Sequence, residues 1–152
     1  MKLAEALLLR ADLQKRIAQV RSRLLRNAKV QEGDAPAEDP QTLLATLEAD
    51  TQALETLIQY INHTNSQARL DSGISLTAAL AKRDVLRLKA GAYRELAEAA
   101  TVTHDRYSRS EVKFVSTIKV RDIQREADGL SKQLRELDAA IQAANWNVDL
   151  LE

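Results

Sequence analysis

The stretch VRDIQREADGLSKQLRELDAAIQAANW, residues 120–146, decides the fold of this chain. Its apolar residues recur at alternating spacings of three and four positions: Val120, Ile123, Ala127, Leu130, Leu134, Leu137, Ile141 and Ala144. That spacing aligns them along one side of an α-helix, in the manner of a coiled-coil seam. We therefore expect a long amphipathic helix over residues 119–146.

Three further segments carry similar apolar seams. In residues 2–30 the seam is Leu3, Ala6, Arg10, Leu13, Ile17, Val20 and Leu24. In residues 40–62 it is Leu43, Leu47, Asp50, Leu54, Leu57 and Ile61. In residues 76–100 we expect the buried stripe to be Ala78, Ala81, Val85, Leu88, Ala92, Leu96 and Ala99. The expected fold class is thus all-α: a single domain, residues 1–152, built as a bundle of four long amphipathic helices with coiled-coil-like seams.

Two connecting segments differ clearly from these helices. Residues 31–39 are acidic and lack apolar periodicity, so they are expected to form a loop. Asp39-Pro40 then suits the N-cap and the first helical position of the next helix. A short loop between helices of matching length predicts an antiparallel hairpin. Residues 63–75 are expected to be irregular, since Asp71-Ser72-Gly73 is typical of a turn.

Residues 101–118 are the least helical part of the chain. In an extended segment Val112, Phe114, Ser116 and Ile118 would lie on one side, with Lys113, Val115 and Thr117 on the other. The segment is also rich in β-branched residues, which favours a short extended or β element. Ser108-Arg109-Ser110-Glu111 also matches a capping box, which would start a helix there instead. For residues 108–117, strand and helix therefore remain as alternatives.

Composition narrows the possible functions. The net charge is zero, so no global field attracts nucleic acid or an anionic membrane. The charge is segregated, with a basic segment at 1–30 and an acidic one at 31–55, which favours packing of these two helices against each other. The absence of cysteine excludes disulfides and Cys-ligated zinc. With neither a signal peptide nor a long apolar run, we expect a cytoplasmic protein with no membrane partner.

No catalytic motif is found in the sequence. His63 and His104 are not part of a metal-binding spacing, and glycine is too scarce for a phosphate-binding loop. Ser108, His104 and Asp105 lie near one another in sequence, but nothing resembles a nucleophile elbow. We therefore expect no catalytic residue, no metal and no cofactor.

The richest polar cluster extends from His104 to Lys119 and contains closely spaced arginines and a tyrosine. Arginine and tyrosine together suit phosphate contacts and base stacking. The candidate ligand- or partner-binding residues are Asn62, Asn65, Arg69, Arg106, Tyr107, Arg109 and Lys113. Two other interpretations remain open: the arginines pair with nearby acids and fix an irregular loop, or the cluster forms a subunit interface.

Several segments resemble a known family. They are MKLAEAL at 1–7, RADLQ at 10–14, NAKVQEG at 27–33, Ile61-Asn62 with Thr64-Asn65, and DRYSRSEVKFV at 105–115. Together they resemble an uncharacterised family of bacterial helical proteins, a domain of unknown function. The resemblance implies a helical intracellular protein without an established activity. Some members carry the label septicolysin, which suggests pore formation, although no segment here would cross a bilayer as a helix.

The function that we expect is therefore non-catalytic: a self-associating helical scaffold or interaction protein that forms a homo-oligomer, dimer or larger. One alternative is binding of nucleic acid or a phosphorylated ligand through the Arg/Tyr-rich segment 104–119. Another is a small-molecule enzyme that uses the same loops.

Overall fold

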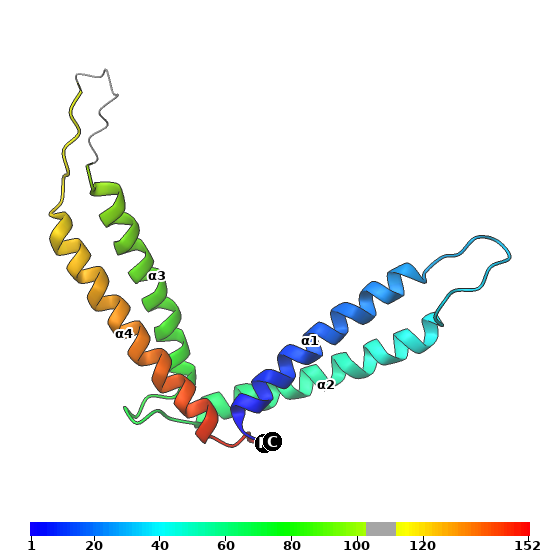
Figure 1. Ribbon diagram of the computed structural model, residues 1–152. Helices are drawn as coiled ribbons and strands as arrows, with labels where there is room; N and C mark the ends of the chain where they lie inside the picture. The colour runs from blue at the N-terminus through cyan, green and yellow to red at the C-terminus, as the bar shows by residue number, and fades with distance from the viewer. Residues whose placement is uncertain (103–111) are drawn as a thin grey trace. The chain divides into compact units, whose positions relative to one another are not determined.

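The computed structural model describes residues 1–102 and 112–152, and this part of the chain contains four long helices (Figure 1). They are α1 (Leu3–Arg26), α2 (Pro40–Gln67), α3 (Leu76–Ala100) and α4 (Val120–Asn147). The expected all-α fold class, with four long helices, is confirmed. The described residues fall into two compact units, residues 1–75 with 142–152 and residues 76–141. The single-domain organisation stays a prediction.

The first unit contains an antiparallel hairpin of α1 and α2. The expected seams face each other: Leu13 and Val20 of α1 are buried, as are Leu43, Leu57 and Ile61 of α2. Ion pairs then join the basic helix to acidic residues. Arg16 donates a 2.7 Å hydrogen bond to Asp50 of α2, which confirms the expected pairing of opposite charges.

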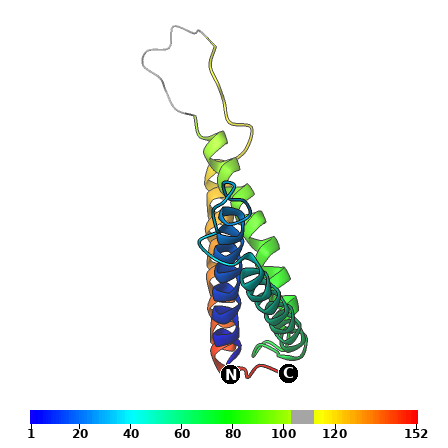
Figure 2. The same ribbon diagram turned by 90° about the vertical axis from the view of Figure 1, so that its right-hand side faces the viewer.

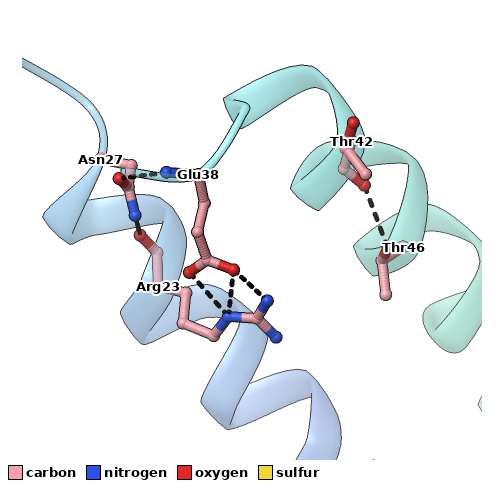
Figure 3. Close-up of polar contacts among 5 residues, drawn as sticks. All are labelled: Arg23, Asn27, Glu38, Thr42 and Thr46. Atoms are coloured by element: carbon pink, nitrogen blue, oxygen red, sulfur yellow. Dashed lines mark hydrogen bonds and ion pairs between the residues drawn. The ribbon is translucent and has the colours of Figure 1, made fainter. Parts of the chain in front are cut away.

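Polar contacts hold together the ends of α1 and α2 that flank the loop (Figure 3). The Arg23 guanidinium binds both carboxylate oxygens of Glu38, and the Asn27 side chain accepts a 3.1 Å hydrogen bond from the Glu38 backbone N–H. Asp39 caps α2, where its side chain accepts from Gln41 N at 3.1 Å and from Thr42 N at 3.3 Å. The Asn27 side chain also bonds back to the Arg23 carbonyl, and α1 ends at Arg26, earlier than expected.

Helix α2 continues to Gln67, beyond the expected end at residue 62. The polar residues of its last turns are accommodated because their hydroxyls bond within the helix. Thr64 Oγ1 donates to the Tyr60 carbonyl at 2.8 Å, and Ser66 Oγ donates to the His63 carbonyl at 2.7 Å. Thr64 is also fully buried and extends the apolar seam by one turn.

The second unit contains the hairpin of α3 and α4, which lie side by side in both views (Figure 1, Figure 2). Its core is formed by Leu86 and Ala90 of α3 with Leu130 of α4, and Tyr93, Leu134 and Leu137 pack against it. Arg83 Nη1 lies 3.7 Å from Asp138 Oδ1 of α4. The seam expected for residues 119–146 is therefore the face that α4 packs against α3.

The buried stripe expected on α3 is wrong. The expected residues Ala78, Ala81, Val85, Leu88, Ala92, Leu96 and Ala99 are all exposed. The residues that the structure buries are Leu76, Ala79, Leu86, Ala90 and Ala97. Helix α3 carries apolar stripes on two faces, and the second stripe, which includes Leu86 and Ala90, packs against Leu130 of α4. Arg83, which interrupts that second stripe in the sequence, is held by Asp138.

The expected short strand within residues 101–118 is not shown. Residues 101–102 and 112–119 belong to no helix or strand, and residues 103–111 lie outside the described part of the chain. The alternative of a helix starting near Ser108 is not found over residues 112–117 either. Isolated β-bridges join Lys2 with Asp149 and Arg69 with Ser75. None of the described helices has the length and apolar character needed to span a membrane.

Candidate functional site

The structure assigns Arg69 a local role in the turn after α2. Its Nη1 donates a 3.1 Å hydrogen bond to the Gly73 carbonyl, and Leu70 N–H donates to the Ile74 carbonyl at 2.9 Å. Gly73 has a φ of 84°, which L side chains rarely adopt, so the turn depends on this glycine. The Arg69 side chain is exposed and therefore retains donors for a ligand.

The other candidate residues do not form one described cluster. Asn62 is exposed and Asn65 is half-buried in the last turns of α2, within the same unit as Arg69. Lys113 is exposed in the other unit. Arg106, Tyr107 and Arg109 lie outside the described residues. That these seven residues act together stays a prediction.

A shallow groove of about 440 Å³ lies at the end of the α3–α4 hairpin. It is lined by Leu96, Ala99, Ala100, Thr101, Val102, Phe114, Val115, Ser116, Thr117 and Ile118. Phe114 and Val115 are each 80% exposed, and the charged Lys113 is not part of the described lining. The described lining holds no charged side chain and is rich in apolar ones, which favours contact with an apolar surface over the binding of a phosphate.

The exposed stripe of α3 continues from this groove along the helix. We call it the α3 stripe and define it as Ala81, Val85, Leu88, Ala92, Leu96 and Ala99. Its large side chains are well exposed: Val85 is 64%, Leu88 75% and Leu96 43% accessible. Single exposed apolar residues are normal, but a contiguous row along a helix is typical of an interaction surface.

The described residues with shifted pKa values are explained by structural partners. A hydrogen bond from Arg23 lowers the pKa of Glu38, and the Thr42 hydroxyl lowers the pKa of Asp39. A hydrogen bond from Lys2 lowers the pKa of Asp149 at the C-terminal end of the chain. None of these carboxylates lines the groove. Within residues 1–102 and 112–152, no group of His, Asp and Glu side chains could hold a metal ion.

Both surface features differ from what the sequence predicted. The α3 stripe was expected in the core, and Phe114 was expected in a strand. A signal for the stripe was available, because Ala79, Leu86, Ala90 and Ala97 repeat at helical spacing on a second face of the same helix. A helix with two apolar faces can bury one of them within the hairpin and expose the other.

The chain is similar to proteins of unknown function. No curated protein matches the chain. The chain is similar to a solved structure, that of a functionally unknown conserved protein from Corynebacterium diphtheriae, with 44% sequence identity and a TM-score of 0.91. The alignment covers 99% of each chain. A family model described as a family of unknown function (DUF6847) matches residues 10–150. Neither match carries the septicolysin label. The expected membership of an uncharacterised family is therefore confirmed, and the chain belongs to this family of unknown function.

Proposed function

We propose that this protein is a non-catalytic helical scaffold or interaction protein that self-associates through the α3 stripe. The observation that carries the proposal is the exposure of a row of apolar residues along most of α3. Covering such a row removes apolar surface from water, which is the dominant favourable term in most protein association. The alanines of the row are small enough to let a second helix approach closely. The cysteine-free sequence supports a reducing, cytoplasmic location as part of this proposal.

The test is the mass of the protein in solution, measured by size-exclusion chromatography with light scattering. We would vary the concentration from about 1 to about 100 μM, which covers association free energies between about 5.5 and about 8 kcal/mol. We expect a dimer or larger oligomer at the upper end. A monomer at every concentration would refute the proposal.

A matched pair of variants ties the oligomer to the α3 stripe. Leu88→Lys places a charge in the centre of the stripe and should shift the protein to the monomer. Leu25→Lys, on α1, changes a side chain of similar exposure, 68% against 75% for Leu88, and should leave the oligomer intact. If Leu88→Lys leaves the mass unchanged while the protein stays helical, another surface forms the oligomer.

Nucleic-acid or phosphorylated-ligand binding through segment 104–119 is the second candidate. The exposed Lys113 and the arginines of that segment support it. The same chromatographic run tests nucleic acid through the ratio of absorbance at 260 and 280 nm. The chain has a single Trp and three Tyr, so bound nucleic acid would dominate the spectrum. A high ratio that collapses at high salt would favour this candidate.

A further inference from the structure

The two edges of the α3 stripe carry charges of opposite sign. Lys82 and Lys89 follow Ala81 and Leu88 by one residue, so they lie on one edge. Asp84 and Glu98 precede Val85 and Ala99 by one residue and lie on the other edge. One residue corresponds to about 100° around an α-helix, so these four exposed side chains flank the stripe on both sides. The second edge also carries Glu95, which precedes Leu96, and Arg87, which precedes Leu88. The stripe therefore has a basic edge and an edge of net negative charge, which we call the acidic edge.

The charges on the two edges indicate which partner helix the stripe can bind. We infer that it binds the α3 stripe of a second copy of this chain, with the two helices parallel; the inference rests on the self-association proposed above. In a parallel pair of helices the residues that flank the seam meet the opposite edge of the partner. The basic edge of each copy then faces the acidic edge of the other.

The seam also defines which charges meet. One heptad has Val85 at its first position and Leu88 at its fourth, and Ala92 begins the next heptad. Asp84 is then the last residue of the preceding heptad, and Lys89 is at the fifth position, directly after Leu88. In a parallel, in-register pair these positions contact each other across the seam. Asp84 of each copy therefore faces Lys89 of the other, and two-fold symmetry makes this contact twice.

The antiparallel arrangement is disfavoured by the same charges. It brings like edges together, so Asp84 and Glu98 would face acidic residues and Lys82 and Lys89 would face lysines. Existing contacts also leave the two key side chains at the surface. Asp84 is paired with the neighbouring Arg83 and its side chain remains 62% exposed, while Lys89 Nζ lies 5.9 Å from the centroid of the Tyr93 ring.

Charge reversal tests the pairing. In the parallel arrangement Asp84→Lys and Lys89→Asp each create two like-charge contacts, and we expect each to weaken the dimer by about 3- to 10-fold. The double variant Asp84→Lys/Lys89→Asp restores opposite charges and should return to within about threefold of the original dissociation constant. Sedimentation equilibrium gives the dimer dissociation constant of the original protein, of the two single variants and of the double variant. A tighter dimer for Asp84→Lys, or a double variant no better than the single variants, would overturn the inference.

Crosslinking tests the direction of the helices independently. The chain has no cysteine, so Ala81→Cys and Ala99→Cys each introduce one thiol. These positions are about 27 Å apart along the helix, far beyond the Cα separation that a disulfide spans. In a parallel, in-register dimer both variants form self-crosslinked dimers on oxidation. An antiparallel pair allows at most one of them to do so, because a residue meets its own copy only at the centre.

The crosslinking experiment has a matched control on α4. Ala139→Cys is exposed on α4, away from its seam, and should not crosslink at the same protein concentration. A protein that is monomeric throughout refutes the self-association proposal itself. A dimer that Leu88→Lys dissociates, but in which only one or neither of the two α3 cysteines crosslinks, refutes the parallel pairing and leaves self-association intact.

Discussion

At the scale of single residues, a buried carboxylate stands out within the α1–α2 seam. Asp50 is 5% exposed and occupies the seam position between Leu47 and Leu54. Its Oδ1 accepts the hydrogen bond from Arg16, whereas the buried Oδ2 has no hydrogen-bond partner. A buried acceptor without a hydrogen bond costs stability, and so does a buried charge that loses its oppositely charged partner. We therefore expect the pair to contribute little net stability to the hairpin, although removal of one partner alone is costly.

Removal of Arg16 alone should therefore destabilise the protein. Arg16→Ala should lower the free energy of unfolding by about 1–3 kcal/mol, because it leaves the Asp50 carboxylate buried without a cation. Arg16→Ala/Asp50→Leu removes both groups and should recover most of that loss. Urea unfolding of both variants measures the difference, with Arg21→Ala as the control for an exposed arginine of the same helix. A double variant no more stable than Arg16→Ala would contradict the prediction.

The ion pair of Arg23 and Glu38 should make stability depend on pH. The hydrogen bond from Arg23 lowers the pKa of Glu38 in the folded protein below its ordinary value of 4.5. A carboxylate with a depressed folded-state pKa contributes stability above the unfolded-state value, and this contribution is lost as the pH falls through the folded-state pKa. Glu38→Gln should therefore lower the melting temperature at pH 7 and match the original protein in strong acid. Glu48→Gln, an exposed residue of α2, corrects for the loss of one negative charge. A gap that persists unchanged from pH 7 to strong acid would be inconsistent with this ion pair.

At the scale of elements, how far the sequence predicts the structure depends on how many apolar faces a helix has. Helices α1, α2 and α4 each carry one dominant seam, and their expected seams are the ones that pack. Helix α3 carries two, and periodicity alone does not say which one α4 covers. The choice depends on contacts between helices, such as Arg83 with Asp138, that no local pattern encodes.

The end of α2 shows the same limit. Asn62 and Asn65 are poor helix formers, so local propensity predicted that the helix stops there. Burial of Thr64 and the hydroxyl bonds within the last turns outweigh that propensity. For the candidate site, the sequence indicated polar residues but not their distribution: Arg69 belongs to the first unit and Lys113 to the second. The pattern around Phe114 predicted a strand and did not indicate the exposed groove.

An element-scale prediction uses the one glycine of α4. Gly129 is exposed, and an added Cβ would meet no atom within 4 Å. Because glycine in a helix interior is less stable than alanine, Gly129→Ala should raise the free energy of unfolding by about 0.5–1 kcal/mol. Gly33→Ala is the matched control: it also meets open space, but its φ of 90° strains any L side chain, so stability should fall. Equal effects at both positions would contradict the role of helix propensity in α4.

At the scale of the whole molecule, the chain ends belong to the same unit as the first hairpin. Leu3 N–H donates to the Val148 carbonyl and Leu150 N–H to the Met1 carbonyl, each at 2.9 Å. Lys2 Nζ lies 2.8 Å from Asp149 Oδ1. These contacts join the last residues to the start of α1, while a further bond reaches α2. The ends of the sequence therefore close one unit through main-chain hydrogen bonds.

Thr64 provides that further bond, and it supports the last prediction. Its buried Oγ1 donates to the Tyr60 carbonyl and accepts a 2.9 Å bond from Leu151 N–H. Thr64→Val keeps the shape but removes the acceptor, so the Leu151 N–H loses its partner and the free energy of unfolding should fall by about 1–2 kcal/mol. Hydrogen exchange should show faster exchange at Leu151. Thr56→Val removes a similar bond to a carbonyl of α2, but at an exposed position, and should change stability by less than about 0.5 kcal/mol. Equal losses of stability in the two variants, with unchanged exchange at Leu151, would show that the Thr64 hydroxyl does not hold the C-terminal residues against α2.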